Sequence, residues 1–396
     1  MSTEIAMPGA MPNQIALLAL PPLSLYIHIP WCVRKCPYCD FNSHEQKGDI
    51  PERRYIDALI SDLDHTLPSI WGRRVTTVFF GGGTPSLFSA AAIDEILAAV
   101  RARVPLASDA EITLEANPGT FEAEKFRGFR AAGVNRLSIG IQSFNAAHLK
   151  ALGRIHDGDE ARRAVAIAQA NFDHINLDLM YALPGQTLED CANDIDAALA
   201  FGVNHLSIYH LTLEPNTLFH RYPPPLPDDE LAADMQAMVD ARLDAAGFVH
   251  YETSAYAKPG FESKHNLNYW RLGDYIGIGA GAHGKISFPD RITREARFKQ
   301  PRTFMDHAAL GTAAEEVKTI APRELPFEFM LNVLRLSEGF PLPLFVERTG
   351  LPLIAITATL DRAEARGLIL RDHLHAKPTE LGRRFQNDLL EMFLPH

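Results

Sequence analysis

Cysteine and positive charge are both scarce in this sequence. Only 4 of its 396 residues are cysteine, too few for the disulfide framework of a secreted protein. Lys and Arg number 38 against 49 Asp and Glu, and the resulting net charge of −11 disfavours a broad nucleic-acid-binding surface. No Lys or Arg precedes Arg34, so we expect no secretion signal.

Long hydrophobic runs are also missing. The most apolar early segment, IALLALPPLSLYIHIP, is interrupted by proline and polar residues before it reaches the roughly 18 apolar positions of a membrane span. Hydrophobic residues still make up 46% of the chain, which is enough for a large core. Together these features predict a cytoplasmic protein of about two or three domains.

Short β-branched runs alternate with helical stretches between residues 23 and 215. Six successive β-α units predict a parallel sheet with right-handed crossovers. We therefore expect an α/β fold, a partial (β/α)6 TIM-like barrel, with its chemistry at the edge where the strands end. The runs predicted as strands are 23–30, 75–83, 111–118, 136–144, 175–185 and 205–215.

The pattern changes twice after these units. YPPPLPDD at 222–229 is a proline-rich connector, and the segment that follows it is less regular. Near the C-terminus, helical stretches precede a short apolar run and a last helix at 380–394, which predicts a winged-helix-like α+β domain. The predicted division is an N-terminal tail at 1–22, the barrel at 23–247, a barrel extension at 248–320 and the C-terminal domain at 321–396.

Three of the four cysteines lie within eight residues, in CVRKCPYC. Cys32, Cys36 and Cys39 have the spacing C-x3-C-x2-C, so one loop can wrap them around a single metal centre. A structural zinc site usually takes four ligands, and His28 or His44 could complete it. A [4Fe–4S] cluster on three thiolates would instead leave one iron open to a non-protein ligand. The spacing leaves both open and favours the cluster.

Glycines and single polar residues follow several predicted strands. VFFGGGTPS places three glycines where backbone groups can approach a ligand closely. Glu115 in LEANP adds an acceptor, and Gln142, Arg154 and Asp178 continue a polar ring at later strand ends and loops. Each residue alone is more often a surface or capping residue, but their succession favours a ligand site. Cys191 lies in helical register with apolar residues, which predicts a buried core position.

CVRKCPYC after the first strand, followed by GGGTP, resembles the radical S-adenosylmethionine (SAM) superfamily. YIHIPWC, CPYCDFNS, FFGGGTPS, GIQSF, LGRIH and NLDLMYALPGQT resemble one branch of it, the oxygen-independent coproporphyrinogen III oxidases and their relatives. The resemblance runs from about Leu23 to the C-terminus. It implies a [4Fe–4S] cluster that binds SAM and can cleave it to a 5′-deoxyadenosyl radical.

The resemblance assigns residues motif by motif. The cluster would be held by Cys32, Cys36 and Cys39. The SAM pocket would be lined by Tyr26, Gly82, Gly83, Thr84 and Glu115. Further positions match residues that contact SAM in the oxidases, including a second SAM molecule: Tyr38, Gln142, Arg154 and Asp178.

Three departures from the oxidase pattern favour haem chaperones of the same branch. The oxidases carry another cysteine where this chain has Phe41, and only 25 residues precede Tyr26, where the oxidases have a longer extension. HNLNY at 265–269 matches an element of the haem chaperones. The resemblance therefore implies haem delivery to acceptor haemoproteins, respiratory enzymes among them, without coproporphyrinogen oxidase activity. The rival interpretation is the oxidase itself, which the near-complete SAM pocket supports.

A haem site needs an axial ligand, an apolar slot and cations for the propionates. His265 and Tyr269 are four residues apart and would share one face of a helix, and the resemblance makes them the candidate haem ligands. A hydrogen-bonded structural turn is the competing interpretation. Trp270 and Tyr275 could form aromatic walls. Candidate partners for the propionates, unless they form an ordinary solvated face, are Arg291, Arg294 and Arg297.

Three further partners can be considered: nucleic acid, the membrane surface and a second copy of the chain. From Pro322 onward 9 Arg and Lys stand against 10 Asp and Glu, a net charge of −1 that gives no support for nucleic-acid binding by the C-terminal domain. Delivery to respiratory enzymes would require a transient visit to the inner membrane surface, and a homodimer is compatible with this role.

Overall fold

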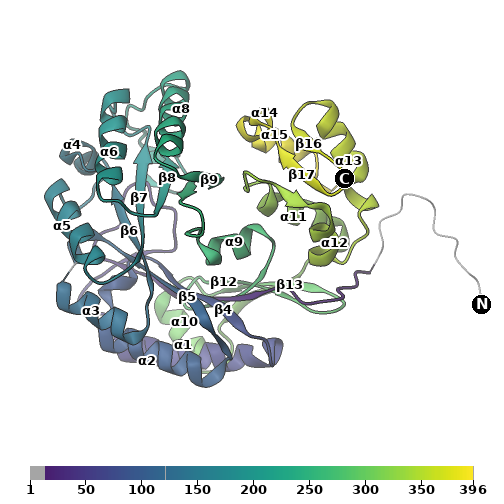
Figure 1. The fold of residues 1–396 in the computed structure, drawn as a ribbon. Helices are drawn as coiled ribbons and strands as arrows, with labels where there is room; N and C mark the ends of the chain where they lie inside the picture. The colour runs from purple at the N-terminus through teal and green to yellow at the C-terminus, as the bar shows by residue number, and fades with distance from the viewer. Residues whose placement is uncertain (1–13, 121, 396) are drawn as a thin grey trace, which may run out of the picture.

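The computed structural model describes residues 14–120 and 122–395 (Figure 1). Six parallel strands form its centre in the order β1-β4-β5-β6-β7-β8 and confirm the expected (β/α)6 arrangement. Their bounds are Leu23–Ile29, Val75–Gly82, Leu106–Ala116, Arg136–Gln142, His174–Tyr181 and His205–His210. The helices that connect or follow these strands are α1 Glu52–Thr66, α2 Ala90–Arg103, α3 Ala123–Ala132, α4 Ala146–Ala151, α5 Gly158–Gln169, α6 Leu188–Ala200, α7 Leu218–Arg221 and α8 Asp229–Ala245.

Strand β6 illustrates how the sequence builds a barrel with a polar interior. Successive side chains of a strand point to opposite faces. In RLSIGIQ, the apolar set Leu137, Ile139 and Ile141 is fully buried in the main hydrophobic core. The alternate positions, from Arg136 through Ser138 and Gly140 to Gln142, line an interior cavity instead.

Residues 248–320 complete the sheet. β10 (Ala255–Ala257) pairs antiparallel with β8, and β11 (Asp274–Ile278) pairs parallel with β1, so this segment extends both edges of one 12-stranded sheet. The prediction of a less regular segment is wrong here, because pairing with β1 depends on contacts far away in the chain. The remaining elements are β9 Val249–Glu252, β12 His283–Ser287, β13 Ile292–Arg297, β14 Ala314–Thr319, α9 Lys264–Trp270 and α10 Pro301–Ala308.

The C-terminal domain has the helices and small sheet that the sequence predicts. Helices α11 (Leu325–Val333), α12 (Leu342–Thr349) and α13 (Ile354–Ala365) precede the hairpin of β16 (Ile369–Arg371) and β17 (His375–Pro378), which β15 (Phe340–Pro341) joins. The last predicted helix is instead two, α14 (Glu380–Arg384) and α15 (Gln386–Glu391), because the backbone of Phe385 leaves the helical region with φ −110° and ψ 43°. Among the described residues no helix is both long and apolar enough to cross a membrane.

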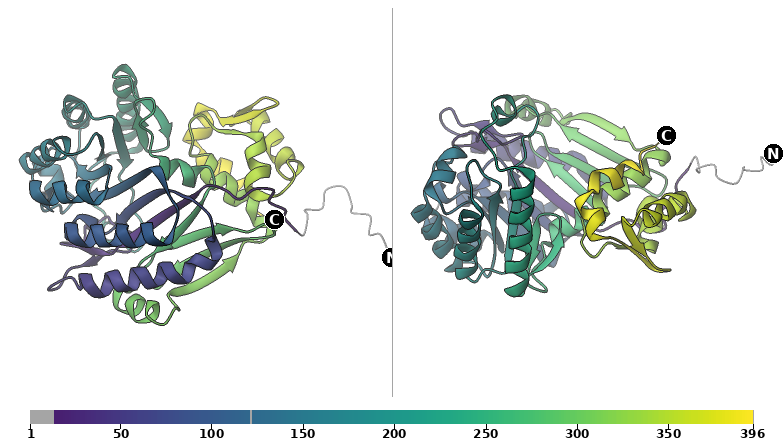
Figure 2. Two further views of the ribbon diagram at one scale, coloured as in Figure 1. Left: turned by 60° about the horizontal axis from the view of Figure 1, so that its bottom comes forward. Right: turned by 90° about the horizontal axis from the view of Figure 1, so that it is seen from above.

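An early segment of the chain fastens this domain to the sheet. Ile15 and Leu17 are buried in the same hydrophobic core as α11 and α12. The Leu17 N–H donates to the Pro289 carbonyl at 2.9 Å, between β12 and β13. Figure 2 shows the C-terminal domain (yellow) beside the light-green strands of the extension.

Candidate functional site

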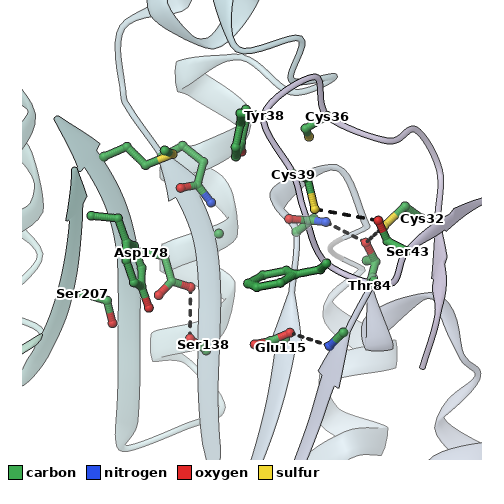
Figure 3. A pocket seen from close by; sticks show the side chains of 18 of the residues that line it. Cys32, Cys36, Tyr38, Cys39, Ser43, Thr84, Glu115, Ser138, Asp178 and Ser207 are labelled. Atoms are coloured by element: carbon green, nitrogen blue, oxygen red, sulfur yellow. Dashed lines mark hydrogen bonds between the residues drawn. The ribbon is translucent and has the colours of Figure 1, made fainter. Parts of the chain in front are cut away.

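The three clustered cysteines lie on the loop after β1, at the edge where the parallel strands end (Figure 3). Short strands β2 (Trp31–Cys32) and β3 (His44–Glu45) pair and close this loop at its base. Each sulfur lies within hydrogen-bond distance of a different side chain: Thr84 Oγ1 is 3.6 Å from Cys32, Arg154 Nη1 is 3.7 Å from Cys36, and Ser43 Oγ is 3.8 Å from Cys39.

The donor set fits an iron–sulfur cluster. Burial raises the pKa of the Cys32 and Cys39 thiols, so a bound metal centre is what would hold them as thiolates. Hydrogen-bond donors aimed at the sulfurs would stabilise those thiolates. Among the described residues, no three His, Cys, Asp or Glu side chains are placed to hold a single metal ion.

The two histidines that could complete a zinc site are engaged elsewhere. His28 is buried, with Nδ1 3.0 Å from the Tyr26 hydroxyl and Nε2 2.9 Å from the Asn42 carbonyl. His44 Nε2 lies 3.2 Å from the Lys299 carbonyl. Burial lowers the pKa of both histidines, so both are neutral at pH 7 and donate to these carbonyls. The protein environment therefore holds them as structural residues.

A cavity of about 480 Å³ extends from the cysteine loop into the barrel. All three cysteines line it, together with every predicted SAM residue except Tyr26. Tyr26 lies one layer behind the wall, with its ring 6.2 Å from that of Phe79, which does line the cavity. The predicted SAM residues in the wall are Tyr38, Gly82, Gly83, Thr84, Glu115, Gln142, Arg154 and Asp178.

Two carboxyl groups face this cavity from neighbouring parts of the sheet. Burial, and to a lesser degree the charge of Asp178, raises the pKa of Glu115 to about 8, against the lowering effect of the Gly82 N–H that donates to it at 3.1 Å. Burial also raises the pKa of Asp178, which accepts from Ser138 Oγ at 3.0 Å and from Asn176 Nδ2 at 2.8 Å. A cationic ligand would restore the Glu115 carboxylate.

The end of β6 is bent to aim its polar groups into the site. Gln142 has φ 67°, in the left-handed region that non-glycine residues rarely occupy, at an irregularity in the pairing of β6 with β7. Arg154 Nη2 donates to Asn117 Oδ1 at 2.6 Å and to the Gly140 carbonyl at 2.7 Å. The same guanidinium that contacts Cys36 therefore also binds β6 and the end of β5.

The candidate haem ligands belong to a closed hydrogen-bonded network on α9. His265 is 1% exposed, with Nε2 2.9 Å from the Tyr269 hydroxyl and Nδ1 2.7 Å from Thr77 Oγ1. The Thr77 hydroxyl donates to Ser24 Oγ at 2.8 Å, so it accepts from Nδ1–H, and Nε2 accepts from Tyr269. Burial, with a smaller effect of Arg136, lowers the pKa of His265 to about 3. Both ring nitrogens are thus occupied in this conformation.

The other residues expected around haem are also bound within the protein. Arg335 lies 4.2 Å from the centre of the Trp270 ring. The Tyr275 hydroxyl accepts from Arg294 Nη1 at 2.9 Å, and Arg294 also pairs with Glu328 of α11. The three arginines do not form one free cationic face: Arg291 pairs with Asp290, and Arg297 is buried against Asp62. The predicted burial of Cys191 is confirmed.

Comparison with known proteins decides the family. The Radical SAM superfamily matches residues 26–198, and the HemN C-terminal domain matches residues 320–385. The chain is 52% identical to the heme chaperone HemW of Escherichia coli over 96% of its own length and 100% of that protein. The chain belongs to the HemW family of the radical SAM superfamily. The predicted resemblance is confirmed.

Other relatives agree with this assignment. The HemW of Bacillus subtilis is 34% identical over 94% of this chain and 99% of its own. The solved structure of E. coli coproporphyrinogen III oxidase (HemN) matches with a TM-score of 0.80 at 23% identity, covering 94% of this chain and 90% of that one. This similarity confirms the fold of the barrel and the C-terminal domain. Membership of the superfamily implies a [4Fe–4S] cluster and SAM.

Several residues that line the cavity were not predicted from the sequence, and Arg136 and Asn266 are among them. Alternation in RLSIGIQ could have placed Arg136 on the same face as Gln142. Nothing in the local sequence around HNLNY indicates that Asn266, rather than His265, faces the cavity, because the placement of α9 depends on distant strands.

Proposed function

We propose that this protein is a haem chaperone, which binds haem and delivers it to acceptor haemoproteins. The observation that carries the proposal is full-length similarity to proteins named heme chaperone HemW, at 52% identity for the E. coli protein. As finer parts of the proposal, we infer a cytoplasmic protein that visits the inner membrane surface transiently, forms a homodimer and serves respiratory haemoproteins.

In this proposal the cysteine loop holds a [4Fe–4S] cluster through Cys32, Cys36 and Cys39. When bound, the cluster supplies an open iron for SAM and an electron that can cleave it. The chain itself orients the sulfurs with Thr84 and Arg154, whose contacts to Cys32 and Cys36 also fix the loop against β4 and β6.

The rest of the SAM molecule would lie in the cavity next to the cysteine loop. Glu115 would take the ammonium, since its carboxyl group faces the cavity and needs a cation to ionise at neutral pH. Gly82 and Gly83 leave their backbone close to the ligand because neither has a side chain. At Gly83 a Cβ would come within 2.5 Å of the Trp31 carbonyl oxygen, so even alanine would shift the cysteine loop.

Haem binding through His265 or Tyr269 requires α9 to rearrange. His265 Nε2 can take iron only after the Tyr269 hydroxyl leaves it. This exchange suits a delivery protein, since the imidazole regains a hydrogen-bond partner when haem departs and release is therefore less costly. Because His265 and Tyr269 are hydrogen-bonded to each other, haem should bind slowly. Binding should be faster when α9 moves and this hydrogen bond breaks.

The test is a haem titration of anaerobically reconstituted protein, followed by transfer to an apo acceptor haemoprotein. We expect stoichiometric binding, seen as a shifted Soret band, and transfer faster than from free haem. A wild-type protein that fails to bind haem tightly would contradict the proposal.

The alternative function is oxygen-independent coproporphyrinogen III oxidation. The set of predicted SAM residues around one cavity favours it, because a carrier has less need for complete SAM machinery. An anaerobic assay with reductant, SAM and coproporphyrinogen decides between the two. Formation of protoporphyrinogen by protein with an intact cluster would establish the oxidase.

A further inference from the structure

One buried arginine of the barrel lacks a partner. Arg136, the first residue of β6, is 5% exposed and lines the cavity. Within the described chain its guanidinium makes no hydrogen bond and no ion pair. Arg297 is buried to the same degree, at 4% exposed, but pairs with Asp62 at 2.8 Å and with Glu295 at 2.7 Å.

The missing partner matters once a ligand fills the cavity. The guanidinium faces the cavity, and a ligand that displaces water from it would leave the charge unpaired, at a cost of several kcal/mol, unless the ligand supplies an anion. Asp178 lies on the neighbouring strand and lines the same cavity, but its carboxylate is held by Ser138 and Asn176 and does not reach Arg136 as an ion pair. A ligand anion would complete the site that the protein leaves open.

Asn266 adds a second unused donor to this part of the cavity. It belongs to the HNLNY run and lines the cavity. Its backbone N–H donates to Ser263 Oγ at 3.3 Å, while its side-chain amide makes no hydrogen bond within the described residues. In the sheet Arg136 pairs with Thr113 of β5, and Thr113 pairs with Phe79 of β4. The Phe79 ring lines the cavity 5.0 Å from the ring of His265, so Arg136 and the first turn of α9 flank the same part of the cavity. A guanidinium and an amide N–H are well suited to bind a carboxylate.

We propose that Arg136 and Asn266 form a subsite for the carboxylate of a ligand held in the barrel. The subsite lies deep in the cavity, because Arg136 begins the strand that Gln142 ends, roughly 20 Å away at about 3.3 Å per residue. If SAM binds through its amino-acid end at the cysteine loop, its own carboxylate is too far away to reach Arg136. The subsite would then be free for the carboxylate of another ligand. Two sources fit, a haem propionate and the carboxylate of a second SAM molecule. The haem case rests on the proposed function.

The experiment compares wild-type protein with Arg136→Met in the full-length, cluster-reconstituted chain. Four probes are used in two pairs: haem and haem dimethyl ester, and SAM and decarboxylated SAM. The SAM pair is titrated after one equivalent of SAM has filled the site at the cluster, so that it reports on a second molecule. For whichever pair uses the subsite, the wild type binds the carboxylate-bearing member about 10- to 100-fold more tightly, as expected for charge-assisted hydrogen bonds of about 1.5–3 kcal/mol. Arg136→Met abolishes that difference, and Asn266→Ala reduces it several-fold.

Stability measurements separate this role from a structural one. Without ligand, Arg136→Met should unfold at the same temperature as the wild type or higher, because it removes an unpaired buried charge. The control Arg297→Met should unfold at a lower temperature with the discrimination between probes unchanged. Arg136→Lys keeps the charge but not the paired donors, and should give an intermediate discrimination if Arg136→Met fails to fold.

Two outcomes overturn the proposal. One is a wild type that binds both members of each pair equally. The other is a folded Arg136→Met variant that keeps the wild-type discrimination, whatever its unfolding temperature. If the wild type does not bind haem at all, the proposed function fails, whereas the SAM pair still tests the subsite.

Discussion

The cysteine loop and helix α9 both carry motifs of the HemW family, but their side chains are used in opposite ways. Cys32, Cys36 and Cys39 face a cavity, where their sulfurs could bind a metal centre. His265 and Tyr269 face each other, and the network that holds them continues through Thr77 to β1. A match to a motif therefore identifies the family in both places, whereas only the contacts reveal which residues are free to bind a ligand.

The largest contrast between the two regions should come from Cys36→Ala. We expect it to abolish the visible absorbance of the reconstituted cluster and to leave the unfolding temperature of the apo protein nearly unchanged. Cys191→Ala, at a buried position on α6, is the matched control and should keep the full cluster. Retention of a full cluster by Cys36→Ala would contradict the assignment of Cys36 as a cluster ligand.

His265→Ala should show the reverse behaviour. Removing this buried ring leaves the Tyr269 hydroxyl without its acceptor and the Thr77 hydroxyl without its donor, and it opens a cavity. We therefore expect the free energy of unfolding to fall by about 2–4 kcal/mol. Cluster content should persist. Urea denaturation measures the change, with Tyr269→Phe as a milder variant costing about 1 kcal/mol. A stable His265→Ala protein that loses only haem binding would show that the α9 side chains, like those of the cysteine loop, serve ligand binding rather than stability.

The pH dependence of SAM binding should show whether Glu115 ionises when it binds a cationic ligand. Its pKa of about 8 means that it is largely protonated at pH 7, so binding of a cation must release a proton. The affinity for SAM should therefore rise between pH 6 and pH 8 and fall above pH 8, where an α-amino group loses its own proton. Glu115→Gln should flatten this dependence. Calorimetry in buffers of different ionisation enthalpy counts the proton, and an unchanged slope in Glu115→Gln would assign the effect to another group.

Phe41→Cys should have the smallest effect. The Phe41 side chain is 62% exposed, so its replacement should change stability by no more than about 0.5 kcal/mol. It also recreates the cysteine of the oxidase pattern. We expect no protoporphyrinogen formation by this variant in the anaerobic assay, because a single thiol does not rebuild the substrate pocket. Oxidase activity in Phe41→Cys would show that position 41 separates the two functions.

The sequence predicted the centre of the fold well and its edges poorly. The runs at 75–83 and 136–144 became β4 and β6 almost residue for residue, because alternation and glycine-rich ends are local signals. Strand β11 escaped prediction because its partner β1 lies some 250 residues earlier, and no local pattern encodes that pairing.

Burial was the other limit on the site. The spacing of His265 and Tyr269 correctly placed both on one helix, but it could not reveal that the strands around Thr77 cover them. Arg136 was overlooked for the converse reason, since an arginine at the start of a strand normally reaches solvent.

The contact of Ile15 and Leu17 with the C-terminal core bears on how the chain is made. Their partners, in α11 and beyond, are synthesised some 300 residues later, an interval of roughly 15–60 s at ordinary elongation rates. Throughout that interval these two apolar side chains lack their final cover, and the C-terminal core stays open until they dock. A prematurely terminated chain would thus expose both residues to chaperones and proteases. The contact of Ile15 and Leu17 with the C-terminal core therefore distinguishes a full-length chain from a truncated one.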